Sequence, residues 1–353
     1  MASASPSTCD LFRATAILSF NVVLTFLQGG FFSIVCPAEI AIFAPDQAAL
    51  FNGLFMGLGA IINVFSPPVG YLADHFGRRP LLLLGALFVA IGEGLLLVGV
   101  YSRHVSYLGL WVFFLGFLLL QVGTVVLTTC FNALVADLAA QMPAKSGLLS
   151  SIFGLYSLVG AAMSFIVGGI VFPVSENEHN FYWFALVITG VAIVALVLSI
   201  PKEADERKRG RGTGSDAPPT RGCCSLACST FSEWWNDVEY GPWRAVVLSR
   251  CLYFFSAGSW GAAAYYFLVD CTDAGSPKEA GKTMAYIAFI SLASSLIAAY
   301  PSGLLSDRVG SVPCTVLSTT ITGLIFVYYP FVDKTSMVLA LIPLYGIAQQ
   351  ICE

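Results

Sequence analysis

The chain has 353 residues, of which 57% are hydrophobic and only 11% are charged. Soluble domains carry about 25% charged residues, and a soluble core of this size could not bury so much apolar surface. A soluble protein is therefore excluded, and the net charge of -4 is too small to indicate nucleic acid or any other charged partner.

The apolar residues lie in blocks of about 20 residues, the length that crosses about 30 Å of hydrocarbon. Because lipid offers no partner to free backbone groups, each block should form a helix. The sequence therefore predicts an all-α polytopic membrane protein. The expected spans are Leu11–Val35, Ala48–Leu72, Pro80–Val100, Ser106–Val135, Gly147–Phe172, Phe181–Ile200, Arg244–Val269, Lys282–Leu305, Val312–Phe331 and Met337 to the end. The first span is too long for the apolar region of a signal peptide, so we expect it to stay uncleaved.

Basic residues are distributed unevenly between the two sides of the predicted bundle. With a cytoplasmic N-terminus, twelve Lys and Arg residues lie on the cytoplasmic side, and four lie on the other: Arg103, Lys278, Lys282 and Lys334. The positive-inside rule then places the N-terminus and the Gly70–Pro80 loop in the cytoplasm. Which cellular membrane holds the protein stays open.

A ten-residue segment occurs twice. PVGYLADHFG (Pro68–Gly77) returns as PSGLLSDRVG (Pro301–Gly310), with proline, glycine, leucine, aspartate and glycine in register at an offset of 233 residues. The same offset relates the starts of the first and seventh spans. This repeat predicts two halves of six spans each, related by internal duplication.

The predicted halves are residues 1–200 and 244–353, joined by a cytoplasmic linker at residues 201–243. The first part of the linker is charged and rich in Gly and Pro, so we expect it to be disordered. The second part contains apolar residues at helical spacing, typical of an amphipathic helix at the membrane interface: Phe231, Trp234, Trp235 and Val238. Cysteines just before it are candidates for palmitoylation: Cys223, Cys224 and Cys228. The alternative is a short packed helix with three reduced thiols.

Two loops resemble those of a known family. One group of residues is similar to the loop motif between helices 2 and 3 of the major facilitator superfamily: Gly70, Leu72, Asp74, Gly77, Arg78 and Arg79. A second group resembles its weaker echo between helices 8 and 9: Gly303, Asp307, Arg308 and Gly310. The segment Asn132–Gly160 resembles the passage from helix 4 to helix 5. Since the family usually has twelve helices, the resemblance implies two six-helix halves with the second incomplete, and hence a fragment truncated after helix 10. A natural ten-span protein is the alternative.

The charged loop suggests a gate. Asp74 can pair with Arg78 across the tight turn that Gly70 and Gly77 allow, and Asp137 at the same end of helix 4 can join them. In the family such a cluster is a latch that holds the cytoplasmic ends together in one of two states. The alternative is a topology signal only. The second latch should be weaker, because Ser311 and Val312 replace the basic pair.

Polar residues inside spans tend to face a cavity, and two stripes each occupy one helix face. Helix 1 has Asn21, Thr25 and Gln28, and helix 4 has Gln121, Thr124, Thr128 and Asn132. The resemblance implies that helices 1, 4, 7 and 10 line a central cavity. It adds Arg250, Tyr253 and Trp260 of helix 7, and Tyr345 and Gln349 of helix 10. The alternatives are helix–helix hydrogen bonds and, for Arg250, snorkelling to the surface.

Helix 5 carries Gly160, Ser164 and Gly168, a small-xxx-small packing face. Gly160 and the Gly168–Gly169 pair resemble the helix 5 signature of the family's antiporters, but Ser164 and Phe165 stand where that signature has Gly-Pro. The partial match weakens an antiport assignment.

Glu93, in the middle of helix 3, is the deepest acid and a candidate to carry a coupling proton. Because helix 3 is peripheral in the family, a neutral structural Glu is the alternative. Cys36 and Cys271, at the outer ends of helices 1 and 7, are either bridged or ordinary apolar residues. No spaced Cys and His set indicates a metal site, and no cofactor is expected.

The predicted function is facilitative or secondary active transport of a small organic solute by alternating access, in a monomer. The amides, hydroxyls and aromatics among the candidates favour a neutral or amphipathic solute. A membrane-embedded enzyme is disfavoured, because the chain has no H-E-x-x-H motif, Walker loop or serine–histidine pairing in its spans. A non-transporting sensor or scaffold with a transporter fold, or an inactive fragment, is the alternative.

Overall fold

A computed structural model describes residues 14–15, 17–63, 65–103, 106–141, 146–172, 179–199, 263–309 and 311–352. Within these residues every regular element is a helix or helical turn, which confirms the predicted all-α fold. The elements are α2 (Phe20–Gln28), η1 (Phe31–Val35), α3 (Cys36–Phe43), η2 (Pro45–Gln47), α4 (Ala48–Asn63), α5 (Ser66–Phe76), α6 (Arg78–Tyr101), α7 (Ser106–Gln141), α8 (Ser146–Ile166), η4 (Val167–Val171), α9 (Asn180–Ser199), α13 (Pro277–Val309), α14 (Ser311–Tyr328), η6 (Tyr329–Phe331) and α15 (Thr335–Cys352). Residues 263–271 form a further helical segment.

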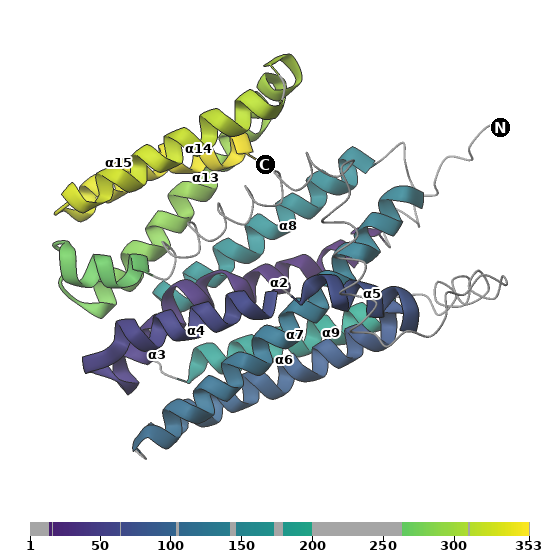
Figure 1. Cartoon of the computed structure of the whole chain (residues 1–353), viewed down its shortest axis with the longest axis horizontal. Helices are drawn as coiled ribbons and strands as arrows, with labels where there is room; N and C mark the ends of the chain where they lie inside the picture. The colour runs from purple at the N-terminus through teal and green to yellow at the C-terminus, as the bar shows by residue number, and fades with distance from the viewer. Residues whose placement is uncertain are drawn as a thin grey trace, which may run out of the picture.

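The helices form two groups (Figure 1). In the first group, α6 packs along α7 and α2 packs along α8; in the second, α15 packs against α13 and α14. The second group meets the first where α13 contacts α8 and η4. We call the end of the bundle where α5 meets α6 the Gly77 end, and the opposite end, where α3 turns into α4, the Pro37 end.

Glycines let α6 and α7 touch through their backbones. A Cβ atom added to Gly92 would lie 2.6 Å from the Leu120 nitrogen, and one added to Gly123 would lie 2.7 Å from the Val89 nitrogen. Because lipid gives helices no hydrophobic reason to associate, such close backbone packing is a main source of helix–helix attraction in membranes. These contacts hold α6 and α7 close together along their length.

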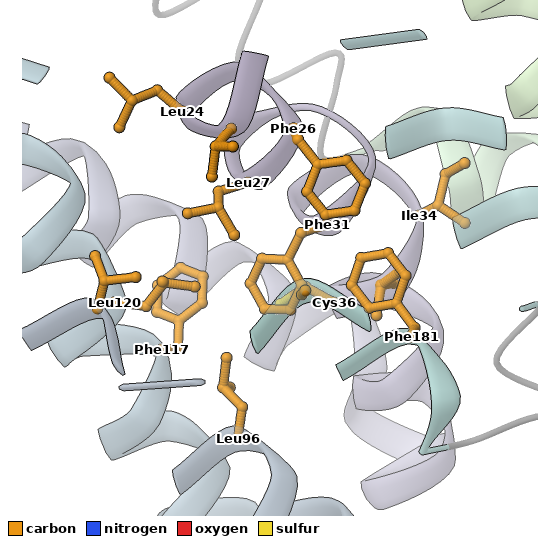
Figure 2. Packing of buried hydrophobic residues seen from close by; sticks show 14 of the residues in the cluster. Leu24, Phe26, Leu27, Phe31, Ile34, Cys36, Leu96, Phe117, Leu120 and Phe181 are labelled. Atoms are coloured by element: carbon orange, nitrogen blue, oxygen red, sulfur yellow. The ribbon is translucent and has the colours of Figure 1, made fainter. Parts of the chain in front are cut away.

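Aromatic side chains fill the core around the first helix (Figure 2). Phe26 of α2 and Phe31 of η1 both stack on Phe181 of α9, with ring centroids 5.9 Å and 6.4 Å apart. Phe32 packs edge-on against Phe117 of α7 at 5.6 Å. These ring contacts join the first helix to α7 (helix 4) and α9 (helix 6) within the first group.

The first helix is longer than the sequence predicted. The expected span ended at Val35, whereas the helix continues through the π-helical turn η1 and then through α3 to Phe43. Pro37 lies in the first turn of α3, directly after the π-helical turn, and the helix continues past it although proline has no N–H to donate. Helix 8 likewise begins at Pro277, not at the predicted Lys282, and Lys282 pairs with Glu279 at 2.8 Å in its first turns.

Among the described residues, seven helices are long and apolar enough to cross a membrane, judged by length and composition. Two shorter apolar helices, Asn180–Leu196 and Thr335–Ala348, stand where the sixth and tenth spans were expected. The seventh predicted span lies mostly outside the described residues. The prediction of a polytopic membrane protein is confirmed.

The loop before α13 holds the start of α15. The Asp273 carboxylate accepts hydrogen bonds from the backbone N–H of Thr335 (2.7 Å) and from its hydroxyl. These two bonds, the hydroxyl first, lower the pKa of the exposed Asp273. Asp273 therefore acts as a cap for the tenth helix.

We expect Asp273→Ala to lower the thermal stability of the chain, whereas Asp273→Asn, which keeps an oxygen acceptor, should lower it less. A depressed pKa contributes stability that is present above the ordinary aspartate value of about 3.9 and is lost as pH falls through the lowered value. Thermal unfolding in detergent between pH 7 and pH 3 tests this. An equal loss in the alanine variant at every pH would contradict the charge-dependent part.

Candidate gate and solute site

The Gly77 turn joins helices 2 and 3. Gly77 has φ 91° and ψ 151°, a backbone conformation that side chains other than glycine rarely adopt. The turn ends α5 and starts α6 at once, so that Arg78 becomes the first residue of α6. The predicted tight turn is therefore present at Gly77.

Arg78 binds three groups at this end of the bundle. Its guanidinium pairs with Asp137 of α7, lies 3.7 Å from the Asp74 carboxylate of α5, and donates a hydrogen bond to the Ala133 carbonyl. The Arg78 side chain is 13% exposed, whereas those of Asp74 and Asp137 are 66% and 42% exposed. The structure thus brings together the three charged residues of the predicted latch, and we call Asp74, Arg78 and Asp137 the charge cluster.

Gly70 has a different environment from the one expected. A Cβ atom at Gly70 would meet only the Thr129 methyl group, at an ordinary 3.7 Å, so this conformation does not need glycine there. Arg79 is partly exposed, beside Arg78 in the first turn of α6.

The second copy of the motif lies where α13 ends. Gly303 and Asp307 belong to α13, and Arg308 is exposed in its last turn. The side chain of Asp307 and the whole of Gly310 lie outside the described residues. The latch role of both loops stays a prediction.

Part of the predicted solute site comes together between helices 1 and 4. The Gln28 amide of α2 lies 3.5 Å from the Thr128 hydroxyl of α7, at the limit of a hydrogen bond. Gln28 is exposed and Thr128 partly so, and Asn132, one turn further along α7, is also exposed. Their role in solute binding stays a prediction.

Other members of the two stripes are used in helix packing. Asn21 is buried and donates hydrogen bonds to the Phe153 carbonyl (3.2 Å) and the Ser157 hydroxyl of α8. Thr25 and Thr124 donate to carbonyls of their own helices, those of Asn21 and Leu120, each at 2.7 Å. Gln121 is buried, and its amide lies against Gly59 of α4. The Asn21 hydrogen bonds match the helix–helix alternative, whereas those of Thr25 and Thr124 stay within their own helices.

The candidates on helices 7 and 10 are only partly described. Arg250, Tyr253 and Trp260 lie outside the described residues, and so does the side chain of Gln349. The half-buried Tyr345 ring lies 6.1 Å from that of Phe326 on α14. Their roles stay predictions.

Glu93 faces helix 6. Its carboxylate is buried and accepts a hydrogen bond from the Thr189 hydroxyl of α9 at 2.9 Å. This contact joins two helices of the first group at a position distinct from the pair of Gln28 and Thr128.

A buried ion pair at the Pro37 end was not anticipated from the sequence. Arg103, which follows α6, pairs with Glu39 of α3, and their side chains are 8% and 0% exposed. The sequence signal was Glu39 itself, an acid inside an apolar stretch, but the assumed end of the span at Val35 placed it in a loop. The sequence places Arg103 in the loop after the third predicted span.

Tyr266 connects the two groups of helices at the same end. Its hydroxyl donates to the Pro37 carbonyl at 3.0 Å and lies 3.4 Å from the Ala48 carbonyl. Nearby, a Cβ atom on Gly169 of η4 would lie 2.8 Å from the Gly281 carbonyl of α13. At the Pro37 end the two groups of helices are therefore in direct contact.

Cys36 is buried and Cys271 is exposed, and both are free thiols. In the part of the chain that the structure describes, no group of His, Cys, Asp and Glu could hold a metal ion. The linker with Cys223, Cys224, Cys228 and the predicted amphipathic helix lies outside the described residues.

A helical bundle with these spans, and with polar and charged groups inside it, defines a polytopic membrane protein. Residues 18–352 match the sequence model of the Major Facilitator Superfamily. The chain belongs to this family.

The chain is also similar in sequence to curated proteins. The chain is 26% identical over 209 residues to the tetracycline resistance protein, class G, of Vibrio anguillarum, covering 57% of this chain and 48% of that protein. It is 23% identical over 193 residues to the class H protein of Pasteurella multocida, covering 53% and 44%. The matched region thus spans about half the length of these relatives.

Among solved structures, the nucleoside transporter NupG has a TM-score of 0.64 at 14% identity, covering 98% of this chain and 80% of that one. The xylose transporter XylE from E. coli, in a partially occluded inward open conformation, has a TM-score of 0.64 at 15% identity, covering 98% and 82%. These likenesses show the fold.

Proposed function

We propose that the protein moves a small organic solute across a membrane by alternating access, as a facilitative or secondary active transporter. The observation that carries this proposal is the closed Pro37 end, where Tyr266 and Gly281 of the second group meet Pro37 and Gly169 of the first. Alternating access requires a state in which the two groups of helices are in contact at one end of the bundle, as they are here.

The N-terminus and the Gly77 end face the cytoplasm in this proposal, because basic residues are concentrated on that side. The charge cluster is then the cytoplasmic latch. The ion pairs described for it lie within the first group and join helices 2, 3 and 4 to one another. Breaking it should cost between the roughly 1 kcal/mol of an exposed ion pair and the 3–5 kcal/mol of a buried one. A free energy of that size favours the latched state and still allows the ion pairs to break during transport.

The solute class follows from the groups that remain accessible. Gln28, Thr128 and Asn132 offer amides and a hydroxyl and no fixed charge, which suits a neutral molecule rich in hydrogen-bonding groups. The names of the similar proteins mention xylose, nucleosides and tetracycline, all of them polar organic molecules. We propose a hydroxyl-bearing solute of this kind.

Uptake into proteoliposomes tests the function. Radiolabelled xylose, a nucleoside and tetracycline are offered with and without an imposed pH gradient, beside empty liposomes. Saturable uptake of at least one solute is expected, and Gln28→Ala with Thr128→Val should raise its KM. Binding without flux of any solute would favour a sensor.

Glu93 is the proton-coupling candidate, and its contact with Thr189 favours the structural alternative. We expect Glu93→Gln to leave the dependence of uptake on the pH gradient unchanged, because glutamine retains an oxygen that can accept the Thr189 hydrogen bond. The measurement is the ratio of uptake with and without the gradient, with Thr189→Val as the control for the lost contact. A ratio of one in the Glu93→Gln variant, with a higher ratio in the wild type, would instead assign the coupling proton to Glu93.

A further inference from the structure

Ser164 of α8 lies inside the backbone hydrogen-bond ladder of helix 1. In an unbroken α-helix the Gly30 N–H would donate to the carbonyl four residues earlier, that of Phe26. Here the Gly30 N–H donates to the Ser164 oxygen (2.7 Å), and the Ser164 hydroxyl donates to the Phe26 carbonyl (2.5 Å). The Ser164 side chain is fully buried. The Ser164 hydroxyl thus replaces one backbone hydrogen bond of helix 1, that from Gly30 to Phe26, which we call the rung. Such an insertion is a known cause of a helix kink.

The backbone around the insertion departs from the α-helix. Gly29 has ψ -97°, and the π-helical turn η1 follows, in which the Cys36 N–H donates to the Phe31 carbonyl five residues back. A Cβ atom on Gly30 would lie 2.5 Å from the Ser164 carbonyl oxygen, so helices 1 and 5 touch through their backbones here. The rings of Phe26 and Phe31, on either side of the broken rung, both lie against Phe181 (Figure 2).

The broken rung lies between two functional regions. On one side is Gln28, two residues earlier, with its contact to Thr128. On the other side is α3, whose Pro37 carbonyl accepts the Tyr266 hydrogen bond that closes the Pro37 end. A change of bend at Gly30 would therefore move α3 relative to Tyr266.

Two arrangements would give the Gly30 N–H, the Phe26 carbonyl and the Ser164 hydroxyl hydrogen-bond partners, as a membrane interior requires. With the hydroxyl inserted, Ser164 completes the bonding of Gly30 and Phe26. With the hydroxyl withdrawn, the Gly30 N–H bonds the Phe26 carbonyl directly, and Ser164 can donate to the carbonyl of its own helix four residues back, that of Gly160. The numbers of hydrogen bonds match, so hydrogen bonding alone does not favour either state.

We propose that Ser164 is a positioning residue that holds helix 1 bent at Gly30 and thereby keeps the Pro37 end closed. Withdrawal of its hydroxyl closes the rung from Gly30 to Phe26, straightens helix 1 and separates α3 from Tyr266. The inference rests on the proposed function in one respect: opening of this end is taken as a step of transport.

The distance across the Pro37 end tests this without a known solute. Spin labels are placed on the exposed native Cys271 and on a cysteine at the exposed position Gln47, with the other nine of the ten cysteines replaced by alanine. Pulsed electron paramagnetic resonance in nanodiscs then gives the populations of short and long distances. Ser164→Ala removes the insertion but leaves the backbone rung free to form, and it should raise the ratio of long to short distances about two- to tenfold.

Ser157→Ala is the matched control. Ser157 lies on the same helix and also bonds helix 1, but through the Asn21 side chain and not the backbone ladder. It should leave the distances unchanged. Ser164→Gly serves as a second variant and should act in the same direction as Ser164→Ala.

Unchanged distances in both Ser164 variants, or an equal change in Ser157→Ala, would overturn the inference. Flux is measured separately. Shifted distances without flux would reject only the transport function, and normal flux with unchanged distances would reject only the role of Ser164.

Discussion

Arg78→Gln is expected to reduce solute uptake about tenfold or more while the protein still inserts into the membrane. Arg78 contacts both other members of the charge cluster, Asp74 and Asp137, and also the Ala133 carbonyl. Its removal leaves two partly exposed carboxylates without this cation at the ends of helices 2 and 4. A loss of about 1.4 kcal/mol corresponds to a factor of ten in rate, well within the range for breaking a half-buried pair. The measurement is the initial rate of uptake, normalised to reconstituted protein.

Arg79→Gln separates the latch from the topology signal. It removes the same positive charge from the same turn. Both variants therefore weaken the positive-inside topology signal equally. Only Arg78→Gln disrupts the ion pairs, and Arg79→Gln should therefore retain most of the wild-type rate. Asp74→Asn, which loses the more distant of the two ion pairs, should fall between them. Equal rates in the two arginine variants would reduce the loop to a topology marker.

Arg103→Gln is expected to cost about 3–5 kcal/mol of stability, because it leaves the Glu39 carboxylate buried without the cation it now pairs with. Glu39 is fully buried and Arg103 nearly so, so water screens this pair far less than the charge cluster. Thermal unfolding of the purified protein in detergent gives the change. Yield of folded protein after solubilisation should fall in parallel.

The double variant Glu39→Gln with Arg103→Gln is the control. With both charges removed, no carboxylate is stranded, and most of the lost stability should return. Failure of the double variant to recover would show that Arg103 acts through packing and not through its charge.

The sequence predicted the charge cluster well because its residues are close along the chain or lie at matching helix ends. Gly77, Asp74 and Arg78 are determined by one turn, and the ion pair with Asp137 needed only the correct end of helix 4. The polar stripes were harder. Periodicity places Asn21 and Gln28 on one face, but it cannot say that α8 packs over Asn21 and leaves Gln28 exposed.

The Pro37 end was missed for a physical reason. The first span was predicted to end at Val35, but the helix continues through the π-helical turn and past Pro37 to Phe43. The contact between Glu39 and Arg103 joins residues 64 positions apart, and the insertion of Ser164 into helix 1 joins residues 134 and 138 positions apart. Such long-range contacts leave no periodic signal in the sequence.

The most direct test of alternating access measures both ends of the bundle. One pair of spin labels spans the Pro37 end, at Gln47 and Cys271, and a second spans the Gly77 end, at the exposed Phe76 and Val309. Alternating access predicts reciprocal populations: conditions or variants that lengthen the distance at one end shorten it at the other, so the two open fractions sum to no more than one. Open fractions that rise together at both ends, or a single fixed distance at each end under all conditions, would contradict it.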